Sequence, residues 1–230
     1  MNEFFSTPAF GVTLTATAFW LGKMFQKHTR FHSLPPIIPA CVIIICILQA
    51  LGVDYQTYSR GSEFIAFMLG PATIAFSLPL IYNATVLKEN LKPLIVGNIC
   101  GGIAGVLAVL ALAKALNISQ ALAVSMVPKS VTAPIAMGIS ETIGGIPSIT
   151  VVMVIFTGIF GAFVGHKILK ACGVTHHIAI GIAMGAAAHA IGANRCLKES
   201  ELQTAVASIS IIIVAIVTAI CAPLLVHFVW

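Results

Sequence analysis

The order of apolar and polar positions divides the chain into long apolar runs joined by short polar loops. Runs close to the length that crosses about 30 Å of hydrocarbon cover residues 5–22, 37–51, 64–82, 93–113, 148–166, 178–195 and 202–230. A further segment, residues 119–146, is apolar at its ends and polar in its middle. This pattern predicts an all-α polytopic membrane protein with seven or eight membrane segments. We expect a single integral membrane domain over residues 1–230.

The region 126–147 does not fit a continuous membrane helix. It contains Lys129, Glu141, three prolines and three glycines. Pro128 and Pro134 each remove a backbone donor and disfavour a smooth helix. Broken backbone within a membrane is tolerated only inside protein or beside a watery cavity. We therefore expect either a re-entrant hairpin or a crossing built from two half-helices.

Two further segments carry interruption signals. Residues 64–82 contain Pro71 and Pro79, with Thr73 as a candidate ligand hydroxyl between them. The stretch 69–75 (LGPATIA) is similar to 184–190 (MGAAAHA), each with a similar span before and after it. A hairpin between these units would give them opposite orientations, so the similarity favours an inverted repeat of the kind found in secondary transporters.

Glycines recur at helical spacing in two of the predicted spans. Gly181, Gly185 and His189 share one face of the span 178–195, which Gly192 is expected to close. A second set at four-residue spacing predicts close packing against a neighbouring helix; it consists of Gly97, Gly101 and Gly105.

Composition restricts the function classes. The chain is 59% hydrophobic and 8% charged, and its net charge of +5 is spread over short loops. No basic stripe with interleaved aromatics is present, so nucleic acid is not an expected partner. The six cysteines form no CxxC pair, and His176-His177 has no acidic or cysteine companion. No HExxH or GxSxG motif occurs, and we expect neither an enzyme nor a cofactor.

The charges around the first span indicate its orientation. Glu3 precedes it and no basic residue does, whereas Lys23, Lys27 and Arg30 follow it. A secretory signal has its positive charge first, so we interpret this run as a retained span with the N-terminus outside. The positive-inside rule does not decide between a hairpin and a crossing for residues 119–146.

Lys129 is the strongest candidate for ligand binding because it coincides with the broken backbone. Its ammonium group could attract a small carboxylate, aided by amides at the start of a half-helix. Ser130 and Thr132 are suitable helix caps whose hydroxyls could also reach a ligand. The structural alternative is an ion pair between Lys129 and Glu141, or a lysine that reaches the membrane interface.

Other polar residues in apolar surroundings are weaker candidates. Glu141 is a candidate for a coupled proton, or else a residue at the interface. His189 is a hydrogen-bonded contact between helices, or else a proton-sensitive ligand opposite the lysine. Arg195 and Asn194 either hold a carboxylate or mark the membrane edge.

Four motifs together resemble the LrgB/CidB family. They are PKSVTAPIA at 128–136, GGIPS at 144–148, LGPAT at 69–73 and AHAIG at 188–192. The resemblance covers nearly the whole chain. Two departures are Ala133, where the family pattern has Thr, and Gly138, where an acidic residue often occurs. The second leaves Glu141 as the only carboxylate of this segment, which weakens any mechanism that needs two acids there.

The resemblance implies two functions. In one, the protein is a secondary transporter of small organic carboxylates such as glycolate, glycerate or pyruvate, with or without a coupled proton. In the other, it is an antiholin-like regulator of murein hydrolase export and cell lysis, acting with a small LrgA/CidA-type membrane protein. We expect the first, in a bacterial inner membrane, and a homodimer. The binding residues would be Lys129, Ser130, Thr132, Thr73, His189, Asn194 and Arg195.

Overall fold

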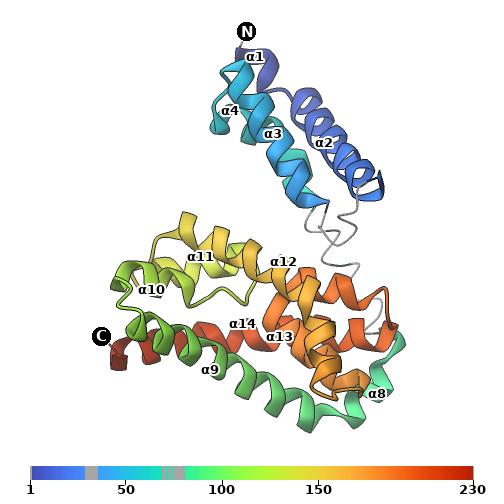
Figure 1. Ribbon diagram of the computed structural model, residues 1–230, viewed down its shortest axis with the longest axis vertical. Coiled ribbons are helices and arrows are strands. Elements are labelled where there is room, and N and C mark those ends of the chain that lie inside the picture. Colours follow the sequence, from blue (N-terminus) through green and yellow to red (C-terminus); the bar gives the residue numbers. More distant parts are fainter. Residues whose placement is uncertain (1, 29–35, 69–70, 72–73, 75–80, 230) are drawn as a thin grey trace. The chain divides into compact units, whose positions relative to one another are not determined.

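The computed structural model describes residues 2–28, 36–68, 71, 74 and 81–229. Within these residues every regular element is a helix (Figure 1), which confirms the predicted all-α class. The chain forms two compact units, Met1–Ala75 and Phe76–Trp230. The single integral membrane domain over residues 1–230 stays a prediction.

The first unit is a helical hairpin, α2 and α3, with one short helix before it and two after it. Its helices are α1 (Asn2–Phe5), α2 (Pro8–His28), α3 (Ile37–Leu51), α4 (Tyr55–Gly61) and α5 (Glu63–Phe67). Gly11 of α2 lies so close to Gly61 that a Cβ atom at Gly11 would overlap the Gly61 backbone. Gly52 ends α3 in the left-handed region, with φ 65°, a conformation that glycine adopts without strain. The chain then bends by 118° into α4.

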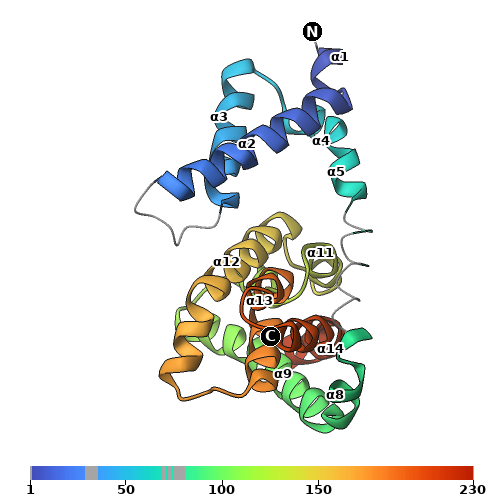
Figure 2. The ribbon, with the colours of Figure 1, turned by 90° about the vertical axis from the view of Figure 1, so that its right-hand side faces the viewer.

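The second unit is a layered bundle. Its helices are α8 (Ala84–Glu89), α9 (Leu91–Ala115), α10 (Gln120–Met126), α11 (Ala133–Thr142), α12 (Pro147–Ala171), α13 (His177–Cys196) and α14 (Glu201–Val229). Helix α13 packs between α12 and α14, and α14 in turn packs on α9 (Figure 2). Its largest buried cluster includes Val106, Leu110, Val154 and Val214. Helices α9, α12 and α14 thus supply a common apolar core.

Three described helices are long and apolar enough to cross a membrane: α9, α12 and α14. A fourth span is reached if the bent pair α3 and α4 counts as one. The predicted spans 93–113, 148–166 and 202–230 are confirmed as the helices 91–115, 147–171 and 201–229. These observations confirm a helical membrane protein, whereas the count of seven or eight segments stays a prediction. Most of the predicted span 64–82 lies outside the described residues.

The predicted interruption of residues 119–146 is confirmed. Helix α10 ends at Met126 and α11 begins at Ala133, with a turn of residues 127–132 between them. Pro128 lies within that turn. Pro134 is in the first turn of α11, where its missing N–H would have had no helical partner. Pro128 therefore accompanies the break, whereas Pro134 begins the next helix.

Helix α13 differs from the prediction in where it breaks. We expected a continuous helix through His189, closed by Gly192. Instead His189 has φ 40° and ψ −137°, which divides α13 into two parts. Gly192 lies beyond the break, and a Cβ atom there would overlap the carbonyl oxygen of Met184. The chain therefore folds back sharply, and Gly192 permits that close approach instead of ending the helix.

The glycine faces pack much as predicted. Ideal Cβ atoms at Gly181 and Gly185 would crowd α14, and those at Gly97 and Gly101 would lie 3.2 and 3.7 Å from α13 side chains. Gly105 differs, because nothing lies within 4 Å of its ideal Cβ position. In the predicted set on α9, packing against α13 is thus confined to Gly97 and Gly101.

Candidate functional site

The turn of residues 127–132 holds Lys129 at a half-buried position. Its Nζ donates a hydrogen bond to Ser130 Oγ at 3.1 Å, and its backbone N–H donates to Met126 O at 3.2 Å. Among the described residues, no carboxylate forms an ion pair with Lys129. The predicted alternative, an ion pair with Glu141, is therefore absent, and Glu141 is exposed in the last turn of α11.

Only part of the predicted capping is present at the start of α11. Thr132 is the N-cap residue, with extended backbone angles of φ −68° and ψ 148°, and its carbonyl accepts the Ala136 N–H at 2.8 Å. Its hydroxyl makes no capping hydrogen bond. The Ser130 hydroxyl contacts the lysine instead. The first amides of α11 thus have no side-chain cap. They form the N-terminal end of the helix, which favours a negative charge nearby.

A cluster of buried hydroxyls that sequence reasoning missed ties the two short helices to α12. Thr150 Oγ1 lies 2.8 Å from the Ser125 carbonyl oxygen and 2.7 Å from Ser140 Oγ. Ser125 lies near the end of α10 and Ser140 in the last turns of α11. Because both contact one atom, the chain turns back on itself between them. The only sequence signal is hydroxyls in otherwise apolar helices, which has many other causes.

His189 lies at the break in α13 with its ring against α12. The side chain is 4% exposed, and Nε2 lies 3.0 Å from the Val154 carbonyl oxygen. A carbonyl oxygen only accepts, so Nε2 carries the proton and Nδ1 is the free nitrogen. A Cβ atom at Gly158 would lie 2.7 Å from this ring. The predicted contact between helices is thus present, in a backbone conformation that non-glycine residues rarely adopt.

Both interruptions pack on the same stripe of α12. The hydroxyl cluster contacts Thr150, and the His189 ring contacts Val154 and Gly158. These α12 residues are four apart in sequence and all are buried. Residues at that spacing lie on one face of a helix. The Lys129 turn and the His189 break are therefore linked through adjacent turns of one helix.

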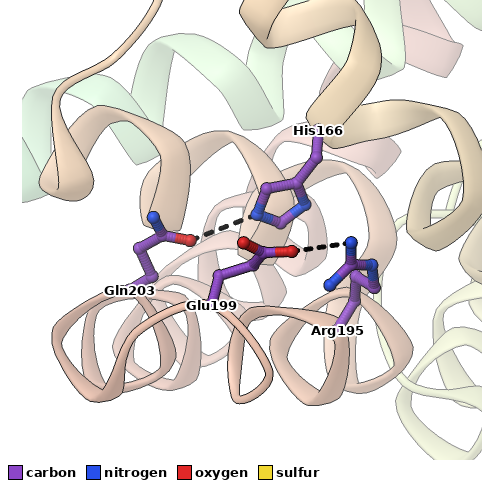
Figure 3. Close-up of polar contacts among 4 residues, drawn as sticks. All are labelled: His166, Arg195, Glu199 and Gln203. Carbon is purple, nitrogen blue, oxygen red and sulfur yellow. Dashed lines mark hydrogen bonds and ion pairs between the residues drawn. The ribbon is translucent and has the colours of Figure 1, made fainter.

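The predicted pair Arg195 and Asn194 lies past the break, near the end of α13. Arg195 Nη2 forms an ion pair with Glu199 Oε1 at 2.8 Å (Figure 3), and both side chains are partly exposed. Asn194 is exposed. The charge of Arg195 is thus already partnered within its own helix end. The last predicted ligand, Thr73, lies outside the described residues.

A second polar arrangement that the sequence did not reveal joins three helices, and Figure 3 shows its contact between His166 and Gln203 beside the Arg195–Glu199 ion pair. Gln203 of α14 lies 3.1 Å from His166 Nε2 through its Oε1, and 3.0 Å from His177 Nδ1 through its Nε2. The amide oxygen accepts and the amide nitrogen donates, so the proton of His166 lies on Nε2. His166 Nδ1 is buried with no partner among the described residues. Gln203 therefore connects α12, α13 and α14 at one end.

Comparison with known proteins places these residues in a family context. The sequence profile of the LrgB-like family matches residues 15–228. The chain is 36% identical over 224 residues to proteins named "Antiholin-like protein LrgB" from Bacillus cereus strains B4264 and AH187 and from Bacillus anthracis strain A0248. Each match covers 97% of this chain and 97% of the relative. No solved structure matches the chain.

Proposed function

Because the chain belongs to the LrgB-like family, we propose that it is an antiholin-like regulator of murein hydrolase export and cell lysis in a bacterial cytoplasmic membrane. The single observation that carries this proposal is the 36% identity, over 97% of the chain, to proteins named antiholin-like. In this role it has seven or eight membrane segments, its N-terminus lies outside, and its partner is a small LrgA/CidA-type membrane protein.

The outer faces of the long helices support lateral association in a membrane. Large apolar side chains are exposed along α9, α12 and α14, for example Leu112, Phe156 and Ile216. Such faces suit lipid, a second copy of the chain or a small membrane partner, since patches of this kind are uncommon on soluble proteins. A homodimer forms part of this proposal.

Autolysis measurements test the regulatory role. In a bacterium whose own LrgB-type gene is deleted, expression of this chain should slow detergent-triggered autolysis. Co-expression of the LrgA/CidA-type partner should increase the effect. An unchanged autolysis rate under both conditions, at confirmed membrane expression, would contradict this function.

Binding and transport of small organic carboxylates is a second candidate, favoured by the surroundings of Lys129. Its ammonium group is half-buried, has no carboxylate partner among the described residues, and sits between two half-helices. Unpaired charge of this kind is costly in a membrane and is usually retained for a ligand. Glycolate, glycerate and pyruvate are the carboxylates proposed.

The proposed anion site has its centre at the turn of residues 127–132. Lys129, Ser130 and Thr132 supply a positive charge, hydroxyls and a helix start with no side-chain cap. His189 Nδ1 carries the lone pair because Nε2 donates to the Val154 carbonyl, so it can accept a hydrogen bond from the hydroxyl of a substrate such as glycolate. Asn194 and Arg195 complete the proposed set, and Glu141 is the proposed proton carrier.

In this proposal residues 119–146 form a re-entrant hairpin. The supporting observation is that Ser125 and Ser140 both contact Thr150 Oγ1, at 2.8 and 2.7 Å. A straight crossing would separate these residues by about 1.5 Å for each intervening residue. The two short arms of this hairpin are α10 and α11. In the proposal, the turn between them is the tip of the hairpin and holds Lys129 within the membrane.

Liposome uptake separates the two candidates. Purified protein should accumulate labelled glycolate or pyruvate, and Lys129→Ala should abolish uptake while the thermal midpoint stays close to wild type. Lys198→Ala, at an exposed lysine, is the matched control and should leave uptake intact. Absence of uptake for every short carboxylate tested, together with autolysis control that Lys129→Ala leaves unaffected, would remove the transport candidate.

A further inference from the structure

We propose that Thr150 is a positioning residue for the anion site, because its hydroxyl fixes the turn that carries Lys129. This inference rests on the proposed anion site and names a residue outside it. Thr150 is fully buried in the first turn of α12, and it contacts both short helices at once.

Three oxygens surround the Thr150 hydroxyl. Ser140 Oγ lies at 2.7 Å, the Ser125 carbonyl oxygen at 2.8 Å and the Ile146 carbonyl oxygen at 3.2 Å. One hydroxyl carries one proton, so Thr150 donates to a single acceptor at a time. When that acceptor is the Ser125 carbonyl, the Ser140 hydroxyl donates to Thr150. The contact to both helices then persists through one donated and one accepted hydrogen bond.

The Ser125 hydroxyl closes the network on its other side. It donates to the Ala121 carbonyl at 2.5 Å and accepts the Ile146 N–H at 2.7 Å. Gly145 fits against the same cluster, since an ideal Cβ there would overlap Ser140 Oγ and lie 3.1 Å from Ser125 N. The end of α10, the end of α11 and the loop before α12 are therefore joined without space for an added methyl group.

This network holds both ends of the segment that contains Lys129. Ser125 precedes the lysine by four residues and Ser140 follows it by eleven. Val127 and Val131, on either side of the lysine, are 2% and 0% exposed and belong to the main core cluster. The turn can thus shift only if the core contacts or the hydroxyl contacts give way. Loss of the Thr150 hydroxyl removes the hydroxyl contacts. It also leaves Ser140 Oγ buried with one hydrogen-bond partner fewer.

Hydrogen exchange of the full-length protein in nanodiscs tests the positioning directly. Thr150→Val keeps the shape of the side chain and removes its hydroxyl, and it should speed amide exchange over residues 127–132 about fivefold, the factor that corresponds to one lost hydrogen bond. Thr150→Ser should restore the wild-type rate. Thr142→Val is the matched control, because that exposed hydroxyl donates to Gly138 O within its own helix and has no other partner in the described part of the chain. Unchanged exchange in Thr150→Val would overturn the inference.

Uptake kinetics give the readout that a purely structural role would not move. In liposomes, Thr150→Val should raise the KM for labelled glycolate or pyruvate several-fold, and Thr150→Ser should reverse the rise. A KM that stays at the wild-type value despite faster exchange would overturn the positioning role.

If the wild-type protein shows no uptake, the anion site fails, whereas the exchange result still decides whether Thr150 fixes the turn. Should Thr150→Val fail to fold, Ser140→Ala, which releases only α11, takes its place in both measurements.

Discussion

His189 Nε2 lies 3.0 Å from the carbonyl oxygen of Val154, which is 35 residues earlier in the chain. The bond connects the break in α13 to the first half of α12. Gly158, four residues after Val154, gives the imidazole ring its space. The strained backbone at His189 is thus supported by one hydrogen bond, to Val154, and by the space that Gly158 leaves for the ring.

Gly158→Ala should destabilise the protein by about 1 to 3 kcal/mol, because its methyl group would lie within 2.7 Å of the His189 ring. The thermal midpoint in detergent measures the effect. Gly105→Ala is the control, since nothing lies within 4 Å of its Cβ position, and it should raise the midpoint through better helix propensity. Equal effects of both substitutions would contradict the described packing.

Gln203→Leu should cost about 1 to 3 kcal/mol, because it leaves the His166 and His177 rings without the amide that joins them. Thermal unfolding again provides the measurement. Gln120→Leu, at an exposed position in the first turn of α10, should change the midpoint little. A Gln203→Leu protein as stable as wild type would mean that the three-helix connection does not form.

Glu199→Gln should change stability by less than about 1 kcal/mol, because its ion pair with Arg195 is partly exposed. The substitution also frees the Arg195 guanidinium. If Arg195 contributes to carboxylate binding, Glu199→Gln should lower the KM for uptake of glycolate or pyruvate. An unchanged KM would assign Arg195 to the helix end alone, as the structural alternative holds.

Maleimide labelling should distinguish Cys172, which directly follows α12, from Cys196, the last residue of α13. Cys172 is exposed after α12, whereas Cys196 is 0% exposed at the end of α13. In native protein, mass spectrometry should find Cys172 modified and Cys196 protected until the protein unfolds. Equal labelling of both thiols without denaturant would contradict the packing of α13 on α14.

Much of the fold could be predicted because apolar length and prolines act locally. The span 93–113 lies within α9, and the break between Met126 and Ala133 follows from a proline and a lysine in an apolar run. Hydropathy and donor loss are properties of each residue. Both are therefore visible without knowledge of the neighbours.

The break at His189 could not be predicted, because its cause is tertiary. The sequence around it is rich in alanine and glycine and contains no proline. The break depends on the Val154 carbonyl and on the space at Gly158, both in another helix. The same holds for Thr150, whose importance arises from Ser125 and Ser140. Site residues at the Lys129 turn were accessible to sequence reasoning, and the residues that hold them were not.

The hydroxyl cluster also imposes an order on biogenesis. Ser125 and Ser140 leave the ribosome before Thr150 does, which follows ten residues after Ser140. Until the start of α12 has been synthesised, the two arms lack the partner that joins them, and their polar groups must be shielded by water or by the insertion machinery. The two arms therefore reach their final hydrogen-bonded arrangement only after the start of α12 has been made, so α10, α11 and α12 complete their folding together.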